Sequence, residues 1–262
     1  MKIKLKTFTM IKGRQCNPGD IIEINNNTAN DLKYRGRAEV FQQKIIQTKN
    51  NLNKTTKKIA IVGSALSTKN DAPFNDKSWQ IYSLNYITGI QRFDLWFDIH
   101  NIKKMWRDHP YWHFLVENQD KLIIAEPIEE LPNASIYPQK EIMAEFGDFF
   151  TNTISWMIAF AIHKNVEELA FYGVDMANDT EYAYQKPSVL YLLGIATGKG
   201  IKINIPEKSR IFEGTIFDFN HKQLDQRLMT LYYLGVAVGQ GIKLNIPDEN
   251  MLFHKEFLYW LI

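Results

Sequence analysis

The stretch AIVGSALSTKN, residues 60–70, marks the point where the chain changes from strand to loop. The apolar run KIAIV, residues 58–62, leads into it and predicts a buried strand. The strand ends at the small residues Gly63, Ser64 and Ala65. Such a loop either leaves room for a ligand or forms a tight turn, and both interpretations are open from these residues alone.

Short apolar strands alternate with helical segments from residue 58 to the C-terminus. We expect strands at 59–62, 80–84, 94–98, 121–125, 168–172, 201–205 and 242–246, and helices at 102–117, 139–147, 152–164, 187–198 and 222–238. This alternation predicts an α/β fold, a mostly parallel Rossmann-like sheet with helices on both faces. Ligands bind at the carboxyl edge of such sheets. The loop after residue 62 therefore lies on the expected functional edge.

The composition indicates a folded protein, because 45% of the 262 residues are hydrophobic and 13% are aromatic. The longest mainly apolar run, residues 154–162, is about half of the roughly 20 residues that a membrane helix needs. The first residues, MKIKLK, lack the apolar segment of a signal peptide. A single cysteine, Cys16, excludes an intramolecular disulfide. We expect a soluble, cytoplasmic protein without membrane contact.

The N-terminal segment differs in charge from the remainder of the chain. Residues 1–58 carry 13 Lys and Arg against 4 Asp and Glu, whereas residues 59–262 carry 18 against 25. The basic residues are scattered and have no interleaved aromatic side chains. This pattern favours a solvated basic face and argues against nucleic-acid binding.

Three parts follow one another along the chain. Residues 1–45 predict a small β/α module with a strand in MKIKLKTF, a turn at NPGD and a strand in IIEI. A helix then begins at Asn27 or Thr28, with Thr28 as a candidate N-cap, and ends near Gly36. The polar residues 46–58 predict a linker. Residues 59–262 then form the Rossmann-like nucleotide-binding domain.

An internal repeat occupies the C-terminal part of this domain. Residues 191–212 return as residues 232–253 with 12 of 22 positions identical. Each copy reads as a helix end, a glycine turn, a strand and a terminating proline, within units of about 187–212 and 222–253. The simplest interpretation is a duplicated helix-strand unit that lengthens the sheet.

Several common catalytic motifs are missing from the sequence. It has no nucleophile elbow, Walker loop, HExxH motif or Cys/His zinc cluster, and GSALS lacks the three glycines of a dinucleotide fingerprint. Pro110 separates His109 from His113, and we expect Asp108 to cap a helix whose first turn contains this proline. We therefore predict no metal site.

Polar residues follow the predicted strands at their carboxyl ends. Strand 94–98 delivers Asp98 and His100, and this histidine can donate to a phosphate or act as a base. Asn85 ends the preceding strand, and its amide can read a base or ribose edge. A packed polar residue and a turn cap are equally compatible interpretations.

The segment 151–185 carries further candidates. Asn152 and Thr153 precede a nearly all-apolar helix, where backbone N–H groups favour an anion, although an ordinary N-cap explains them equally well. The strand ELAFYGVD follows and delivers Asp175 at its end. We expect Tyr182 and Tyr184 in the next loop, where their phenols can bind phosphate oxygens.

The motifs VGSALS (62–67), IYSLN (81–85) and NTISWMIAFAIHKNVEELAFYGVDM (152–176) resemble those of a known family. It comprises the bacterial sialyltransferases with a single Rossmann-like domain and their relatives, the 6-hydroxymethylpterin pyrophosphokinase-like proteins and the flagellar motility accessory glycosyltransferases. The resemblance covers about residues 59–212. It implies a CMP-linked nucleotide-sugar donor as substrate, with no cofactor and no metal required. The nucleotide-binding residues that it implies are Gly63, Ser64, Asn85, Asn152, Thr153, Tyr182 and Tyr184.

The chain departs from the family at two positions. The region of the family's catalytic histidine reads AYQKPSVL here, and Phe149 and Phe150 stand where the family has an arginine. His221, at the head of the second repeat, and His100 are the alternative bases. Asp175 is the remaining catalytic candidate.

The first 40 residues, with their PGD turn and the closing RGRAE, resemble a module at the start of many phage morphogenesis proteins. This resemblance implies contacts with other phage proteins through residues 1–45, and a location in the host cytosol or on the virion. We therefore expect a phage-type glycosyltransferase-like protein that acts on an unidentified acceptor. The alternative is a non-catalytic virion or assembly protein that retains the fold. A third hypothesis, ATP-dependent pyrophosphoryl transfer, requires Mg²⁺ at carboxylates such as Asp98 and Asp175.

Overall fold

The computed structural model describes residues 2–11, 14–40, 57–85, 87–176, 181–212, 222–245 and 253. The chain divides into two compact units, Met1–Gln47 and Thr48–Ile262. The division lies inside the segment that the sequence predicts as a linker.

The first unit consists of two small antiparallel sheets and one helix. Strand β1 (Lys2–Leu5) pairs with β4 (Ile21–Glu23) and β5 (Ala38–Val40), and β2 (Thr9–Ile11) pairs with β3 (Arg14–Cys16). Helix α1 (Asn26–Tyr34) buries Ala29 and Leu32 in a cluster with Ile3 and Leu5. A small apolar core of its own therefore holds this unit together.

The helix of the first unit begins before the predicted position. Asn25 caps it in place of Thr28, because the Asn25 side chain accepts a hydrogen bond from the Thr28 backbone N–H at 2.9 Å. The sequence also misses β2, β3 and β5. Each of these strands is three residues long, which is too short to show a hydrophobic period.

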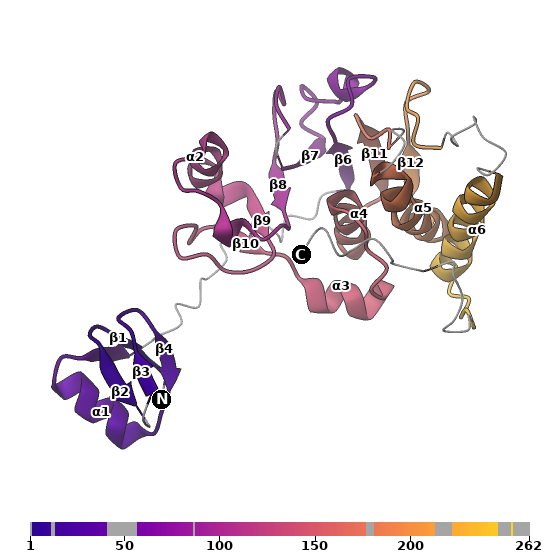
Figure 1. Cartoon of the computed structure of the whole chain (residues 1–262). Coiled ribbons are helices and arrows are strands. Elements are labelled where there is room, and N and C mark those ends of the chain that lie inside the picture. Colours follow the sequence, from indigo (N-terminus) through magenta and orange to yellow (C-terminus); the bar gives the residue numbers. More distant parts are fainter. Residues whose placement is uncertain are drawn as a thin grey trace. The chain divides into compact units, whose positions relative to one another are not determined.

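The second unit is built on one seven-stranded parallel sheet with strand order β10-β9-β8-β7-β6-β11-β12 (Figure 1). The strands are β6 (Lys58–Val62), β7 (Trp79–Leu84), β8 (Leu95–Asp98), β9 (Leu122–Ile124), β10 (Ser135–Ile136), β11 (Glu168–Tyr172) and β12 (Lys202–Asn204). The chain winds outward from β6 in one direction and continues with β11 in the other. The strand order therefore reverses between β6 and β11, as in a Rossmann-like fold.

Helices cover this sheet. They are α2 (Pro110–Glu117), α3 (Gln139–Phe146), α4 (Thr153–His163), α5 (Glu181–Gly198) and α6 (Lys222–Gly239), with single 3₁₀ turns η2 (Lys69–Asp71), η3 (Ile102–Lys104) and η4 (Gln119–Lys121). Among the residues described, no helix is both long and apolar enough to cross a membrane.

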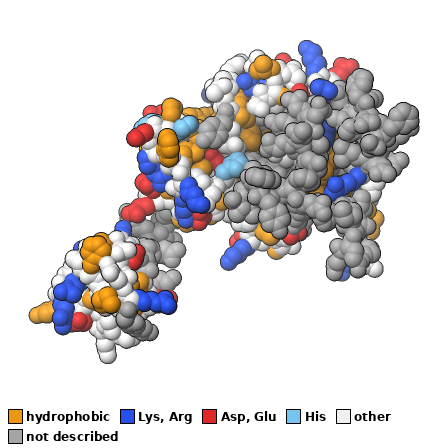
Figure 2. Space-filling model, viewed as in Figure 1, with side chains coloured by type: hydrophobic (Ala, Val, Ile, Leu, Met, Phe, Trp, Pro, Cys, Tyr) orange, Lys and Arg blue, Asp and Glu red, His pale blue; other side chains and the backbone are white. Residues whose placement is uncertain are grey.

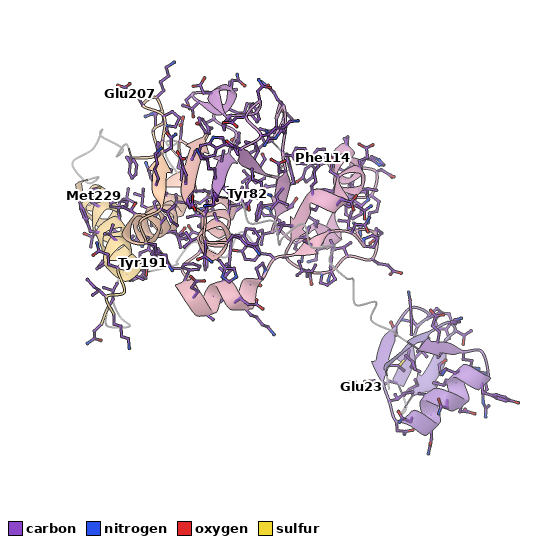
Figure 3. The ribbon with its side chains drawn as sticks, turned by 180° about the vertical axis from the view of Figure 1, so that it is seen from behind. Glu23, Tyr82, Phe114, Tyr191, Glu207 and Met229 are labelled. Carbon is purple, nitrogen blue, oxygen red and sulfur yellow. The ribbon has the colours of Figure 1, made fainter. Side chains whose placement is uncertain are left out.

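Successive residues of the buried strands point to opposite faces. Ile59, Tyr82 and Phe97 share a core cluster with α3, α4 and α5 on one face. The rings of Tyr82 and Phe97 both contact Phe160 of α4, and Figure 3 labels Tyr82 in this part of the unit. On the other face, α2 packs against β8 and β9, and the segment after η2 packs against β6 and β7. The predicted α/β fold with both faces covered is confirmed.

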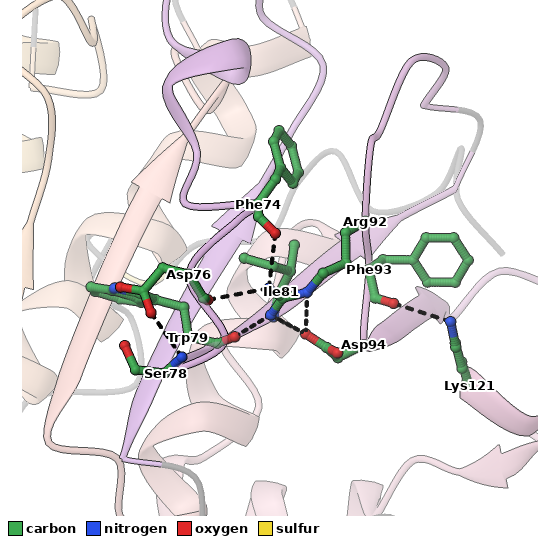
Figure 4. A network of polar contacts seen from close by, with 9 residues as sticks. All are labelled: Phe74, Asp76, Ser78, Trp79, Ile81, Arg92, Phe93, Asp94 and Lys121. Atoms are coloured by element: carbon green, nitrogen blue, oxygen red, sulfur yellow. Dashed lines mark hydrogen bonds and ion pairs between the residues drawn. The ribbon is translucent and has the colours of Figure 1, made fainter.

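An arginine fixes the amino ends of β7 and β8 (Figure 4). The Arg92 guanidinium donates to the backbone carbonyls of Phe74 at 2.9 Å and Asp76 at 3.1 Å, and to the carbonyl of Trp79. It also pairs with the Asp94 carboxylate at 2.8 Å. This network lies at the amino edge of the sheet, where β7 and β8 begin, and so leaves the carboxyl edge to other residues.

Two predicted helices have different bounds in the structure. The segment 102–117 divides into η3 and α2, and His109 caps α2 in place of Asp108, with its Nδ1 accepting from the Tyr111 N–H at 3.1 Å. Helix α5 begins at Glu181 and continues through Pro187, whereas the sequence places its start at that proline. A proline is most common in the first turn of a helix, which explains the error at α5.

The repeat packs helix against helix, and of its two copies the first adds a strand to the sheet, β12, whereas the second adds none within the described residues. Residues 242–245 form no strand, and residue 246 of the predicted strand lies outside the described residues. Instead, α5 and α6 lie against each other through glycines (Figure 1). A Cβ on Gly194 or Gly198 of α5 would overlap a backbone carbonyl of α6, and a Cβ on Gly235 or Gly239 of α6 would overlap one of α5. Close backbone approach therefore explains why both copies retain these glycines.

Candidate functional site

Two polar residues stand side by side where β7 and β8 end. Leu84 pairs with Phe97 in the register of these strands. The next step places Asn85 beside Asp98, and the Asn85 N–H donates to the Phe97 carbonyl at 3.2 Å, so the pairing continues past the strand. Both residues were predicted from the sequence to lie at this edge.

Ser64 lies in the loop that follows the neighbouring strand, β6. We call Ser64, Asn85 and Asp98 the row of polar residues. Val62 pairs with Ser83 in the register of β6 and β7. Ser64 follows the last residue of β6 by two positions, at the same edge of the sheet as Asn85. Ser64 is exposed, so its hydroxyl is accessible at the carboxyl edge. Three adjacent parallel strands therefore each deliver one of the selected polar residues.

Asp98 is a buried carboxylate that holds two neighbouring side chains. It is only 1% exposed, and its Oδ1 accepts from the Nδ1 of His100 at 3.0 Å. Its Oδ2 accepts from the Tyr111 hydroxyl at 2.8 Å, and that hydroxyl accepts from the Trp96 Nε1 at 2.9 Å. A buried carboxylate is stable only when its oxygens are hydrogen-bonded. Both oxygens have donors here, so the carboxylate is rigidly placed.

His100 lies just beyond β8, with 38% of its side chain exposed. The hydrogen bond to Asp98 raises the pKa of His100 above its ordinary value, and partial burial opposes this increase. An ionised carboxylate can only accept a hydrogen bond, so the proton of the neutral ring resides on Nδ1. The Nε2 atom then carries the lone pair that a general base needs. Figure 2 shows histidine side chains in pale blue on the surface of this unit.

Asn85 has a buried acceptor without a donor. Within the described part of the chain, its Oδ1 is the one buried side-chain nitrogen or oxygen that makes no hydrogen bond. An unsatisfied buried polar group costs about 1–3 kcal/mol. A ligand N–H or O–H at this position would remove that cost. The amide oxygen is therefore suited to accept a hydrogen bond from a ligand.

The small residues of the first loop have a packing role at the point where the strand order reverses. A Cβ on Gly63 would overlap the Gly173 carbonyl oxygen, and a Cβ on Gly173 would lie 2.7 Å from the Gly63 carbonyl oxygen. The Ala65 N–H donates to the Gly173 carbonyl at 2.9 Å, and the Gly173 N–H donates to the Thr68 hydroxyl at 2.8 Å. Gly63 is therefore required by the contact between two loops, whether or not a ligand binds there.

Asn152 serves mainly as a helix cap. Its Oδ1 accepts from the Ser155 N–H at 2.9 Å, and its Nδ2 donates to the Gln185 carbonyl at 2.7 Å. Thr153 is the buried first residue of α4. This helix packs on one face of the sheet, whereas α2, which holds Asp98 through Tyr111, packs on the other.

The remaining predicted residues are Asp175, Tyr182, Tyr184 and His221. Asp175 follows β11, on the far side of β6 from β7, and its Oδ1 accepts from the Arg210 N–H at 3.3 Å. Tyr182 and Tyr184 belong to the first turn of α5 and not to the predicted loop, because the helix begins at Glu181. Their side chains, and all of His221, lie outside the described part of the structure.

Two further residues of this part of the unit could not be predicted from the sequence. Tyr111 appears in the sequence as an ordinary apolar position of α2, and its bond to Asp98 depends on how the helix packs. Lys69 lies in a polar loop yet is only 9% exposed, and nothing in its local sequence indicates burial. In the described ranges, no group of three or more His, Cys, Asp or Glu side chains is placed to hold a metal ion.

Comparison of the chain with protein-family models, with curated proteins and with solved structures finds no match. The residues of the site itself therefore carry the functional argument.

Proposed function

We propose that the chain is a glycosyltransferase-like protein that binds a nucleotide donor, of the CMP-sugar type, at the carboxyl edge of its sheet. The proposal rests on the pairing of Asp98 with His100 at 3.0 Å. A buried carboxylate that orients a half-exposed histidine is the arrangement of a general base. The resemblance of the loops around residues 62–67 and 81–85 to those of sialyltransferases supports the choice of donor.

The transfer step assigns one role to each side chain of the row. The Nε2 of neutral His100 takes the proton from an acceptor hydroxyl, and the acceptor oxygen bonds to the anomeric carbon of the donor sugar. The bond from that carbon to the phosphate oxygen breaks, and the nucleotide leaves with the electron pair. Asp98 stabilises the imidazolium that forms. The Ser64 hydroxyl and the Asn85 amide hold the nucleotide.

Further donor contacts come from residues that the sequence analysis selected elsewhere. Tyr182 and Tyr184 are proposed for the donor phosphate, and His221 is the alternative base. The acceptor is unidentified, and the expected location is the host cytosol. None of these assignments is needed for the test of the Asp98–His100 pair.

A thermal-shift titration tests nucleotide binding. The full chain is titrated with CMP, CDP, UDP, GDP and ATP, with and without Mg²⁺, because a ligand that binds only the native state raises Tm by mass action. We expect an increase that is selective for CMP and independent of Mg²⁺. An increase seen only with ATP and Mg²⁺ would favour pyrophosphoryl transfer, and no increase with any nucleotide would refute the proposal.

Two variants then test the site. Asn85→Ala should weaken CMP binding, because it removes the amide with the unsatisfied oxygen. His100→Gln should leave CMP binding within about threefold and abolish transfer or donor hydrolysis, since a base acts on the acceptor. The matched control is His113→Gln, an exposed histidine of α2. Equal activity of His100→Gln and the control would exclude His100 as the base.

A second candidate is a virion or assembly protein without catalysis. The contact between Gly63 and Gly173 favours it, because this contact accounts for the small residues of the first loop without a ligand. The first 40 residues, which lie in the separate unit Met1–Gln47, also resemble a phage module in sequence. Quantitative mass spectrometry of purified particles distinguishes the candidates, since a structural protein is present at a fixed, stoichiometric ratio.

A further inference from the structure

A nearly buried lysine lies in the segment that follows β6. Lys69 begins η2, in the segment between β6 and β7, and is 9% exposed. Lysine is almost never buried to this extent unless its charge is paired. Its backbone N–H donates to the Ala65 carbonyl at 3.3 Å. The lysine is thus tied to the loop that follows β6.

The ammonium group has one neutral partner. Its Nζ donates to the backbone carbonyl of Thr88 at 3.0 Å, in the segment that follows β7. Among the ion pairs that the described residues form, none includes Lys69. An ammonium has three N–H donors, so the carbonyl of Thr88 uses only one. A positive charge of this kind is suited to an anion that arrives with the ligand.

The bond to Thr88 brings Lys69 to the segment that follows Asn85. Thr88 lies three residues after Asn85, whose buried Oδ1 lacks a donor. One short segment therefore contacts a buried cation and contains an unsatisfied acceptor. A ligand with an anionic group and a hydrogen-bond donor would satisfy both. A phosphate ester with amino or hydroxyl groups, such as a nucleotide, has this chemistry.

We propose that Lys69 binds the phosphate of the ligand, and that it supplies the positive charge of the site. This inference rests on the proposed function, because it assigns the charged group for the same nucleotide. The competing explanation is that Lys69 only ties together the segments after β6 and β7. In that case the lysine would contribute to stability and not to ligand affinity.

The test uses inorganic pyrophosphate and CMP as separate probes, in EDTA, with the full chain. Lys69→Met removes the charge and keeps an unbranched side chain. Lys202→Met is the matched control, because Lys202 is an exposed lysine at the amino end of β12 that pairs with Glu168. We expect Lys69→Met to bind both probes at least about tenfold more weakly than the wild type, as for the loss of a hydrogen bond to a charged group. The control should bind within about twofold of the wild type.

The outcomes separate this inference from the proposed function. If Lys69→Met binds CMP as tightly as the wild type, the role of Lys69 is refuted and the nucleotide site stands. If pyrophosphate binds through Lys69 and no nucleotide or nucleoside binds, the anion site stands and the nucleotide function falls. If the wild type binds neither probe, Lys69 has no ligand role.

A measurement on the unmodified chain covers the case in which Lys69→Met does not fold. In amide NMR spectra, pyrophosphate should shift the signals of Ala65, Lys69, Thr88 and Gly89 more than those of the first unit or of α6. If the largest changes in amide chemical shift occur at other residues, the inference is contradicted.

Discussion

Gly194 and Gly235 occupy equivalent positions of the repeat, and each faces a backbone carbonyl of the opposite helix. A Cβ on Gly194 would overlap the Tyr232 carbonyl oxygen, and a Cβ on Gly235 would overlap that of Tyr191. Figure 3 labels Tyr191 on α5 and Met229 on α6. The duplicated sequence therefore forms a helix pair in which each copy makes the same contact with the other.

Replacing either glycine by alanine should destabilise the second unit. Alanine in a helix is intrinsically better than glycine by about 1 kcal/mol, so helix propensity alone predicts the opposite sign. The overlap with a backbone carbonyl should outweigh the gain in helix propensity, so that the free energy of unfolding decreases by about 1–3 kcal/mol. Urea denaturation of Gly235→Ala measures this loss. Thr230→Ala, at an exposed position of α6, is the control and should be neutral or stabilising.

Gly63→Ala should be strongly destabilising for the same physical reason at a different place. The added methyl group would overlap the Gly173 carbonyl oxygen, and both loops are fixed by the sheet below them. We expect a loss of at least about 2 kcal/mol in the free energy of unfolding. Ser64→Ala, one residue later and exposed, should change it by less than about 0.5 kcal/mol. Equal effects of the two substitutions would show that the loop adapts.

The pKa of His100 predicts how its contribution to stability varies with pH. Because the hydrogen bond to Asp98 raises this pKa in the folded state, folding favours the protonated ring. The contribution is fully present below the unfolded pKa of about 6.5 and is lost as the pH increases through the folded pKa.

Urea denaturation of the wild type and of His100→Gln at several pH values tests this relationship. The difference in the free energy of unfolding should be largest below about pH 6.5 and should decline at higher pH. His113→Gln is the control. A difference that does not change with pH would show that the pair with Asp98 does not form in solution.

Leu5→Ala should unfold the first unit without affecting the second. Leu5 is 2% exposed in the core of a unit of 47 residues. Units of this size have a small free energy of unfolding, because they bury little surface. Loss of a buried leucine costs about 2–5 kcal/mol. Hydrogen exchange followed by mass spectrometry should show loss of protection in residues 2–40 alone. Lys6→Ala, at an exposed position, should leave both units protected.

Arg92→Met should lower stability and leave the ligand site intact. The substitution leaves the carbonyls of Phe74, Asp76 and Trp79 without the guanidinium, at an expected cost of about 2–4 kcal/mol. Because the network lies at the amino ends of β7 and β8, any increase in Tm caused by CMP should be unchanged. Arg92→Lys should also be destabilising, since lysine cannot form the planar fork. A loss of CMP binding in either variant would show that the two edges are coupled.

The long apolar strands can be predicted because burial on both faces leaves a continuous hydrophobic run in the sequence. Runs such as KIAIV at 58–62 and ELAFY at 168–172 need no information from the remainder of the chain. Strand β10 has only two residues, so it leaves no such run. The predicted strand at 242–246 has the right composition and fails in the described residues 242–245, because a strand forms only where a neighbour pairs with it.

Some residues of the candidate site could likewise be predicted from the sequence, and others could not. Asn85 and His100 could be found from their places after apolar runs, since parallel strands deliver their carboxyl ends to one edge. The second partner of Asp98, Tyr111, could not be predicted, because its hydroxyl reaches the carboxylate only after α2 packs on β8. Asn152 has the residue type of both a cap and a ligand contact, and its bonds to Ser155 and Gln185 place it as a cap.

The sequence by itself determined the parallel α/β architecture and the edge at which its polar residues gather, because hydrophobic periodicity and the alternation of strands with helices along the chain can be found in the sequence alone. Only the tertiary structure decided which partner each of these residues contacts. Gly63 meets Gly173, Lys69 meets Thr88, and the two copies of the repeat meet through their glycines. These contacts join residues that are far apart in the sequence, and their geometry exists only after the elements pack.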